Sequence, residues 1–176
     1  MLYAAFLRAI NVGAANRITM ADLKAVCAEA GFAGVATYLQ SGNLVFEAED
    51  EGDTVAARLE AALAGRGLKN VQAMVRSKAD VAAVVADCPM EAYGDERYRR
   101  FVTLFREPIP AGFALGPGNA HVQVVAVRAR ELVTVVETCA PNGVDVNGVL
   151  GKAIKIPATT RYWHVVGGVL ELMDRR

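Results

Sequence analysis

The chain has 176 residues, of which 53% are hydrophobic and 22% are charged, a balance typical of a globular protein and not of a disordered one. A chain of this length buries about 70% of its unfolded surface, so it needs neither a disulfide nor a structural metal to fold. Nineteen basic residues balance nineteen acidic ones. This zero formal charge argues against nonspecific binding to nucleic acid, which requires a basic surplus.

Several other classes of protein are disfavoured by what the sequence lacks. No apolar stretch approaches the roughly 18 residues of a membrane span, and no basic leader precedes the first apolar run, so we expect a cytoplasmic protein without a membrane partner. Cys27, Cys88 and Cys139 are far apart and odd in number, which favours free thiols. Because the sequence has no HExxH, CxxC, P-loop or dinucleotide fingerprint, it predicts no metal site and no cofactor.

Hydrophobic periodicity predicts six elements in the first 77 residues, in the order β-α-β-β-α-β. They are a strand over 2–7, a helix from Thr19 to Gly31, strands over 35–40 and 44–46, a helix capped by Asp53 or Thr54, and a strand over 71–75. This is the split βαβ, ferredoxin-like order, with the strands arranged 4-1-3-2 in an antiparallel sheet. Between the second and third strands, Gly42-Asn43 predicts a two-residue hairpin turn with glycine at its first central position.

Residues 78–176 are expected to form a second α+β subdomain, which the hypothesis of a degenerate duplication would make a copy of the first. The predicted elements are a helix capped by Ser77 and Asp80 and ended by Pro89, an irregular stretch over 90–100, a strand over 101–105, a loop or lid over 107–119, a hairpin of strands 121–127 and 132–137, a Gly- and Asn-rich loop over 141–151, and a last helix from Thr159 or Thr160. The fold class is therefore α+β, with domains 1–77 and 78–176.

Polar residues gather in two segments that the predicted strand order brings to one end of the first sheet. The loop after the first strand and the following hairpin turn supply Arg8, Asn11, Gly13, Asn16, Gln40, Ser41 and Asn43. Backbone N–H groups at the start of the first helix could add to an anion site there. The alternative is that the Asn and Ser side chains satisfy the turn backbone, while Arg8 pairs with a carboxylate.

A second polar cluster lies where the last helix is expected to begin. Arg161 and His164 would then stand in its first turn, where a cation opposes the helix dipole at a cost of roughly 0.3–1 kcal/mol. An anionic ligand would remove that conflict, and so would a salt bridge to an Asp or Glu of the other subdomain. Trp163 fits either a ligand contact or a core anchor.

These same residues carry a resemblance to a known family. The stretches FLRAINVG at 6–13, with Ile18 and Met20 after it, TYLQSGNLVF at 37–46, and TRYW at 160–163 resemble the bacterial domain of unknown function 1697 family (DUF 1697). The third stretch departs from the family pattern Thr-Arg-Asn-Trp-Asn-Thr at Tyr162, His164 and Val165, while Arg161 and Trp163 match it. The resemblance implies an α+β fold built on ferredoxin-like units, with no established activity, substrate or cofactor.

The first functional hypothesis is a site for a small anionic or phosphorylated ligand, lined by the first loop, the Gln-Ser-Gly-Asn turn and the residues Arg161 and Trp163. Two alternatives remain, a nucleic-acid-binding module that uses Tyr3 and Phe46 on the sheet face, and an interaction or dimerisation domain. The sequence does not decide whether the protein is an enzyme, which ligand it binds, its oligomeric state, or whether residues 107–119 close over a site.

Overall fold

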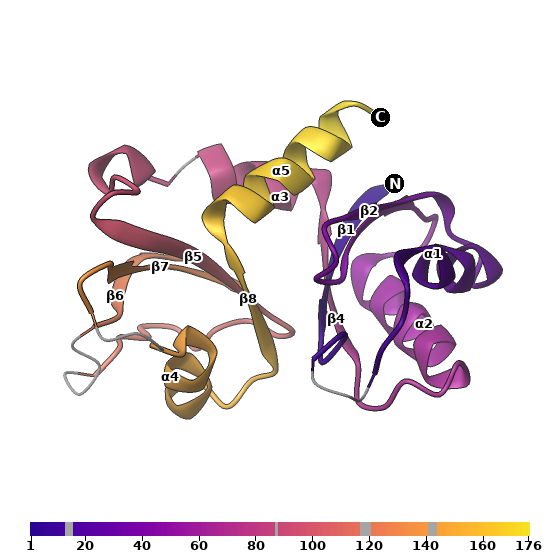
Figure 1. Ribbon diagram of the computed structural model, residues 1–176, viewed down its shortest axis with the longest axis horizontal. Helices are drawn as coiled ribbons and strands as arrows, with labels where there is room; N and C mark the ends of the chain where they lie inside the picture. Colours follow the sequence, from indigo (N-terminus) through magenta and orange to yellow (C-terminus); the bar gives the residue numbers. More distant parts are fainter. Residues whose placement is uncertain (13–15, 87, 117–120, 141–143) are drawn as a thin grey trace. The chain divides into compact units, whose positions relative to one another are not determined.

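The computed structural model describes residues 1–12, 16–86, 88–116, 121–140 and 144–176. They form two compact units, residues 1–83 together with 167–176, and residues 84–166 (Figure 1). The domain boundary expected after residue 77 therefore lies shortly before this division, and the end of the chain belongs to the first unit. No helix in the described part of the chain is long and apolar enough to cross a membrane.

The first unit contains a four-stranded antiparallel sheet in the order β2-β3-β1-β4, which is the predicted order 4-1-3-2. Its strands and helices are β1 (Leu2–Arg8), α1 (Met20–Glu29), β2 (Ala33–Tyr38), β3 (Asn43–Glu47), α2 (Gly52–Gly65) and β4 (Gln72–Ser77). Both helices lie on the same face of the sheet (Figure 1). The chain thus has the β-α-β-β-α-β order that the periodicity predicts.

The core of the first unit lies between this sheet and its two helices. Alternate residues of β1, Tyr3, Ala5 and Leu7, point toward the helices because successive side chains of a strand face opposite sides. They pack with apolar residues of the other elements, which include Leu23, Val26, Cys27, Leu44, Phe46, Leu59 and Leu63. The 3.6-residue spacing of the helical members explains why both helices keep one stripe against the sheet.

The helix starts of the first unit differ in how they are capped. Thr19 caps α1, since its hydroxyl accepts the Asp22 N–H at 3.0 Å, as the sequence predicts. The predicted start of α2 at Asp53 or Thr54 is wrong, because the Val55 N–H bonds to the Glu51 carbonyl at 2.9 Å and the helix begins at Gly52. Helical hydrogen bonding therefore starts before the residues with capping side chains.

The turn between β2 and β3 is longer than predicted. Tyr38 and Asn43 form the last strand pair, so residues 39–42 make a four-residue connection, and Asn43 belongs to β3. Leu39 and Gly42 both adopt left-handed backbone conformations, with φ of 57° and 72°. Two left-handed residues separated by Gln40 and Ser41 reverse the chain here, where a two-residue turn was expected.

The second unit is also built on a four-stranded antiparallel sheet, in the order β6-β7-β5-β8. Its strands are β5 (Tyr98–Phe105), β6 (Gln123–Val127), β7 (Glu131–Glu137) and β8 (Ala158–Tyr162). The helices of this half of the chain are α3 (Lys78–Ala86), the short 3₁₀ helix η1 (Met90–Ala92), α4 (Val146–Ala153) and α5 (Trp163–Asp174). When the four strands of each sheet are numbered in chain order, both sheets have the same spatial order: second, third, first, fourth.

Three predictions in this half need correction. The last helix does not begin at Thr159 or Thr160, because these residues belong to β8, where Thr160 pairs with Thr103 of β5, and α5 starts at Trp163. Residues 144–151 are not all loop, since residues from Val146 onward form α4, which buries Val146 and Leu150 in an apolar cluster. The irregular stretch over 90–100 includes η1 and the start of β5. Residues 107–116 form no helix or strand, and residues 117–119 and 141–143 lie outside the described part.

Candidate functional site

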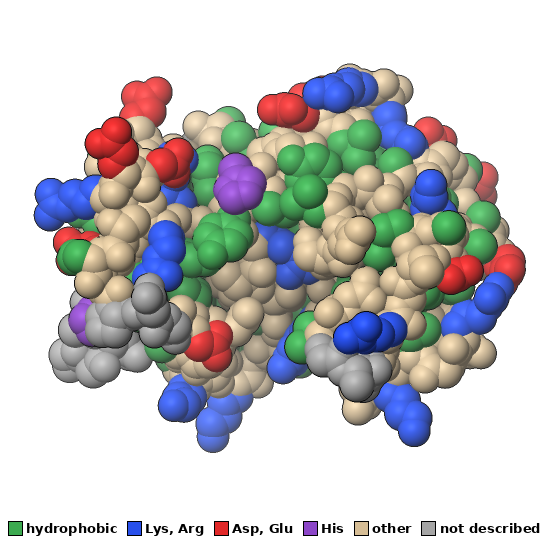
Figure 2. Space-filling view, viewed as in Figure 1, with side chains coloured by type: hydrophobic (Ala, Val, Ile, Leu, Met, Phe, Trp, Pro, Cys, Tyr) green, Lys and Arg blue, Asp and Glu red, His purple; other side chains and the backbone are tan. Residues whose placement is uncertain are grey.

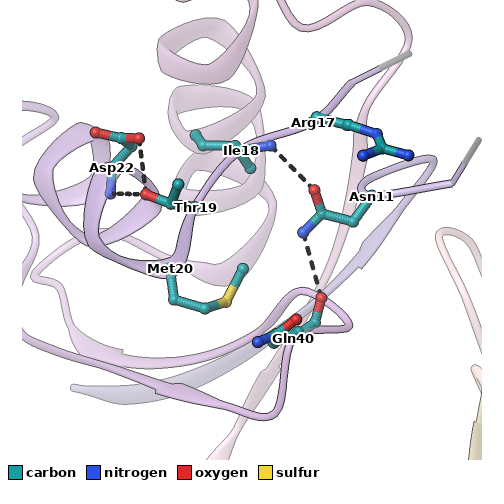
Figure 3. A pocket seen from close by; sticks show the side chains of 7 residues that line it. All are labelled: Asn11, Arg17, Ile18, Thr19, Met20, Asp22 and Gln40. Carbon is teal, nitrogen blue, oxygen red and sulfur yellow. Dashed lines mark hydrogen bonds between the residues drawn. The ribbon is translucent and has the colours of Figure 1, made fainter. Parts of the chain in front are cut away.

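A pocket of about 750 Å³ opens in the first unit where the loop after β1 enters α1. Figure 3 shows the residues that line it, which are Asn11, Arg17, Ile18, Thr19, Met20, Asp22 and Gln40. Asn11 and Gln40 are predicted site residues, one from the loop and one from the turn between β2 and β3. The predicted convergence of these two segments at one end of the sheet is therefore found in the structure.

Asn11 holds the two sides of the pocket together. Its side-chain amide donates to the Gln40 carbonyl at 3.3 Å, and its Oδ1 accepts the Ile18 N–H at 3.0 Å (Figure 3). Asn11 also adopts a left-handed backbone conformation, with φ of 54°, which asparagine tolerates better than most residues. A single carboxamide thus fixes the turn against the segment that begins α1.

The charged groups of the pocket come from the two sides of the α1 start. Arg17 precedes the Thr19 cap and contributes a cationic guanidinium to the lining. Asp22 stands in the first turn, where its carboxylate accepts the Thr19 hydroxyl at 2.7 Å and is favoured by the helix dipole. Figure 3 shows these two side chains on opposite sides of the Ile18-Thr19 segment. A ligand in this pocket meets a cation at one side and an anion at the other.

The remaining lining offers apolar surface and one uncommitted amide. Ile18 and Met20 are half-buried, and the Met20 thioether extends into the space between Thr19 and Asn11 (Figure 3). The Gln40 side chain is exposed, and its carboxamide has no hydrogen-bond partner among the residues that the structure describes. This carboxamide presents a donor and an acceptor to anything that enters.

Two other predicted residues of this region, Asn16 and Asn43, bond to the backbone, and Ser41 accepts a hydrogen bond from the Asn43 side chain. Asn16 donates to the carbonyls of Ala9 and Lys69, at 2.8 and 2.7 Å, and accepts the Lys69 N–H at 2.8 Å. Asn43 is fully buried and donates to the Tyr38 carbonyl and to Ser41 Oγ, both at 2.9 Å. They fasten the loop to the segment before β4 and close the β2–β3 turn. The contacts of Asn16 and Asn43 are those that the alternative expects of the Asn side chains.

Arg8 is directed to the neighbouring strand. Its Nη1 donates to Oε1 of Gln72 at 3.0 Å, across the β1–β4 pair in which these two residues stand opposite each other. Its partner is thus a neutral amide and not the expected carboxylate. Gly13 lies outside the described residues.

Arg161 and Trp163 belong to the second unit. Arg161 is on β8, where Nη1 donates to Thr159 Oγ1 at 2.7 Å and to the Thr160 carbonyl at 3.0 Å. Burial lowers the pKa of the Arg161 guanidinium to about 10. Trp163 packs against a small apolar cluster that contains Met90, Val133 and Val135. The nine predicted site residues are therefore divided between the two units, with Asn11 and Gln40 in the lining of the pocket.

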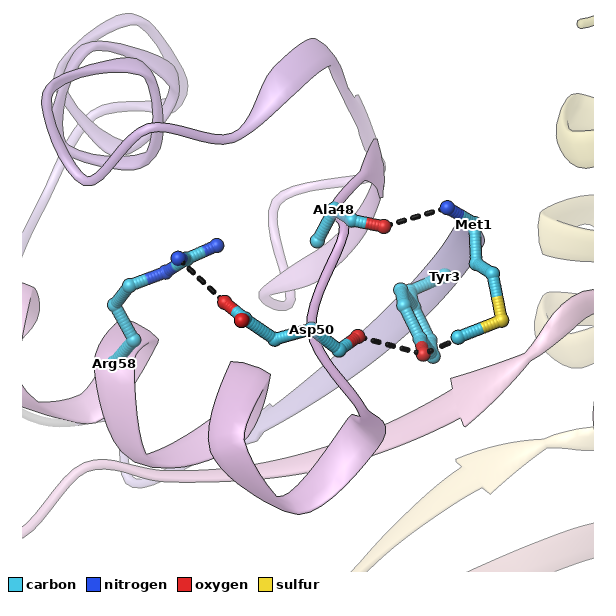
Figure 4. Close-up of polar contacts among 5 residues, drawn as sticks. All are labelled: Met1, Tyr3, Ala48, Asp50 and Arg58. Atoms are coloured by element: carbon cyan, nitrogen blue, oxygen red, sulfur yellow. Dashed lines mark hydrogen bonds and ion pairs between the residues drawn. The ribbon is translucent and has the colours of Figure 1, made fainter.

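A further polar group in the first unit has a structural role. The Tyr3 hydroxyl donates to the Asp50 carbonyl at 2.9 Å, and the Asp50 carboxylate pairs with Arg58 of α2 at 2.6 Å (Figure 4). The N-terminal ammonium donates to the Ala48 carbonyl. These contacts tie the segment between β3 and α2 to β1. Among the described residues, no three His, Cys, Asp or Glu side chains are grouped so that they could hold a metal ion.

Two antiparallel sheets with helices, and a polar pocket beside the first helix, define an α+β protein with one candidate ligand site in its first unit. The chain belongs to the protein family of unknown function DUF1697, whose model matches residues 1–132. It is similar in fold to the conserved bacterial protein SP0830 from Streptococcus pneumoniae, with a TM-score of 0.72, 18% sequence identity and 98% of each chain covered. No curated protein matches the chain. The family match includes both segments that form the pocket and ends before the TRYW stretch at 160–163.

Proposed function

We propose that the protein binds a small anionic or phosphorylated ligand in the pocket between the β1–α1 loop and the β2–β3 turn. The observation that carries this proposal is the position of Asn11, which bonds to both sides of the pocket and so holds Arg17 and Gln40 on fixed segments. A site whose walls are already tied together loses little conformational entropy when a ligand binds.

The size of the pocket and its charges support the same proposal. Its volume of about 750 Å³ falls within the range of roughly 300–1,000 Å³ typical of small-molecule sites. Arg17 supplies a planar guanidinium, which suits phosphate and carboxylate groups because it can donate two parallel hydrogen bonds. Asp22 is engaged by the Thr19 cap, so the anionic part of a ligand is expected on the Arg17 side.

The test is a thermal-shift screen of the purified protein against phosphorylated metabolites and inorganic phosphate. A ligand at 100 times its dissociation constant stabilises a protein by about 2.7 kcal/mol, which is readily measured. We expect at least one phosphorylated compound to raise the melting temperature, and Arg17→Ala to abolish the rise. Arg175→Ala is the matched control, because Arg175 is an exposed arginine that directly follows the last residue of α5 and lies outside the pocket. Among the described acidic residues, it pairs with Glu171. Equal responses of the two variants would contradict the proposal.

The structure gives less support to the nucleic-acid hypothesis. Tyr3 and Phe46, the aromatic residues that it requires on an open sheet face, are buried in the core against α1 and α2. Basic and acidic side chains are interspersed on the face shown in Figure 2, in agreement with the zero formal charge. Stacking on bases and a basic surface are the two features on which such binding depends.

For the fold, we propose that both units are ferredoxin-like and that the second is a degenerate copy of the first. The support is the common strand arrangement, since β2-β3-β1-β4 and β6-β7-β5-β8 differ only by a shift of four in strand number. The helices agree in part, because α2 and α4 both lie between the third and fourth strands of their sheets, and α3 and α5 both follow the fourth.

A further inference from the structure

Building on the proposed function, we infer that the ligand is a nucleoside monophosphate, with its phosphate at Arg17, its base against Ile18 and Met20, and the edge of the base at Gln40. The inference rests on the same pocket and names the class of ligand that this lining fits. It predicts that a phosphate that carries a base binds more tightly than a simple anion or a sugar phosphate does.

The volume of the pocket and its apolar lining favour a ligand with a ring. Inorganic phosphate is far smaller than about 750 Å³ and would leave most of the pocket filled with water. The half-buried Ile18 and Met20 provide apolar surface inside it. A methionine thioether contacts aromatic rings favourably, by about 0.3–1.5 kcal/mol. A flat heteroaromatic base would cover this surface, which a sugar phosphate would leave wet.

Gln40 supplies the group that could recognise the edge of such a base. Its carboxamide has no hydrogen-bond partner among the described residues, and Figure 3 shows it beside Met20. A glutamine amide can donate and accept at once, which matches the N6 and N7 positions of adenine. Because Asn11 holds the Gln40 backbone, this amide starts from a fixed point of the turn. Adenine is therefore the base that we expect to bind best.

The charged groups set the direction of the ligand. Arg17 lies at the end of the pocket away from Met20 and Gln40 in Figure 3, so phosphate and base would occupy different ends. The Asp22 carboxylate lies on the opposite side of the Ile18-Thr19 segment from Arg17 and would repel a phosphate placed there. One orientation is therefore favoured over its reverse.

The experiment is isothermal titration calorimetry of the full chain with four probes: adenosine monophosphate, ribose 5-phosphate, adenosine and inorganic phosphate. We expect adenosine monophosphate to bind at least about tenfold tighter than ribose 5-phosphate, the difference that one bidentate base contact supplies. Gln40→Ala should remove this preference and leave the affinity for ribose 5-phosphate unchanged. Arg17→Ala should lower the affinities for adenosine monophosphate and ribose 5-phosphate by the same factor and leave the affinity for adenosine unchanged. Gln123→Ala, a change of an exposed glutamine in the second unit, is the matched control.

The outcomes distinguish this inference from the proposed function. Equal affinities for adenosine monophosphate and ribose 5-phosphate would overturn the inference while the anion site stands. A preference that survives in Gln40→Ala would overturn the assigned base position. If neither phosphorylated probe nor any other phosphorylated metabolite binds, the proposed function fails, and the inference fails with it. The unfolding midpoint of each variant shows that it is folded, as expected for substitutions at exposed side chains.

Discussion

Gly42 is the residue at which the turn of the candidate site is most sensitive to substitution. Its φ of 72° is strained for any residue with a side chain, and a Cβ there would lie 2.5 Å from Ile10 Cγ2 and 3.0 Å from Leu7 Cβ. We expect Gly42→Ala to lower the free energy of unfolding by about 2 kcal/mol or more, from backbone strain and steric overlap together. Urea denaturation monitored by circular dichroism measures this loss.

Gly67→Ala is the control for the backbone contribution. Gly67 has a φ of 84°, yet a Cβ there meets nothing within 4 Å. Gly67→Ala should therefore lower the free energy of unfolding by about 1 kcal/mol, from the left-handed conformation alone. Equal losses for the two variants would show that the contacts with Ile10 and Leu7 relax without cost.

Two cysteines are predicted to differ sharply in reactivity. Cys27 is fully buried in the core of the first unit, and burial raises the pKa of its thiol from 9.0 to about 12. The thiolate is the reactive form, so Cys27 should resist a thiol reagent from pH 7 to pH 9, while the exposed Cys139 is accessible to the reagent and is labelled. Peptide mass spectrometry after timed labelling gives both rates. Rapid labelling of Cys27 without denaturant would contradict its burial.

Burial of Cys27 also gives the pH dependence of stability a definite sign. The unfolded chain loses the thiol proton near its ordinary pKa, whereas the folded chain retains it up to the raised pKa. The contribution of this thiol is thus fully present below pH 9 and is lost as the pH rises toward 12. A Cys27→Ala variant should lack that part of the alkaline loss of stability.

Individual residues of the pocket show what a sequence does and does not reveal about a site. Asn11 and Gln40 could be predicted because strand order alone brings their two segments together. Arg17 was missed, although it stands next to the predicted Asn16, because which side of a polar loop faces a pocket depends on its left-handed residues. The contact of Arg8 with Gln72 follows from the β1–β4 register, which the order of strands does not specify.

The pairing of β8 with β5 supplies a test at the level of elements. Thr160 donates to Asn147 Oδ1 of α4 at 2.8 Å, so its hydroxyl accepts the Thr103 proton across the strand pair at 2.7 Å. Thr160→Val should cost about 1–3 kcal/mol, because it leaves the buried Thr103 hydroxyl without its acceptor. Thermal unfolding of the wild-type protein and of Thr160→Val measures this loss of stability.

The double variant Thr103→Val/Thr160→Val is expected to lose less than the sum of the two single variants. Replacing both partners removes the unsatisfied hydroxyl as well as the bond. Strict additivity would show that the two hydroxyls do not depend on each other, and would contradict the hydrogen bond between Thr103 and Thr160.

Elements whose pattern is local were predicted well, and those that depend on distant contacts were not. The α1 cap at Thr19 and the stripes of α1 and α2 can be read from neighbouring residues, and the structure confirms them. The segment 146–153 contains Asn147, Gly148 and Gly151, which are poor helix formers, and becomes α4 because Val146 and Leu150 are buried against other parts of the second unit. The helical spacing from Trp163 onward was correct, but pairing with β5 converts the residues before it into a strand.

On the scale of the whole chain, the first unit is completed by the last residues of the sequence. Residues 167–176 belong to it although residues 84–166 form the other unit. Within the first unit, Lys78 pairs with Asp174 at 3.0 Å and donates to the Met173 carbonyl at 3.3 Å, and Arg176 donates to the Gly34 carbonyl on β2. A unit assembled from residues 1–83 and 167–176 cannot fold fully until residues 167–176 have been synthesised.

This arrangement predicts that removal of the C-terminal segment destabilises the protein strongly. Val169 and Met173 are fully buried, and each such side chain contributes about 1.5–3 kcal/mol by leaving water. A chain ending at Val166 should therefore lose about 3–6 kcal/mol of unfolding free energy, enough to unfold a domain of ordinary stability. The control ends at Asp174, loses Arg175 and Arg176 with their exposed contacts, and should cost about 1 kcal/mol or less. Melting temperatures that are equal for the two truncated chains would show that residues 167–174 are dispensable, and would contradict their place in the first unit.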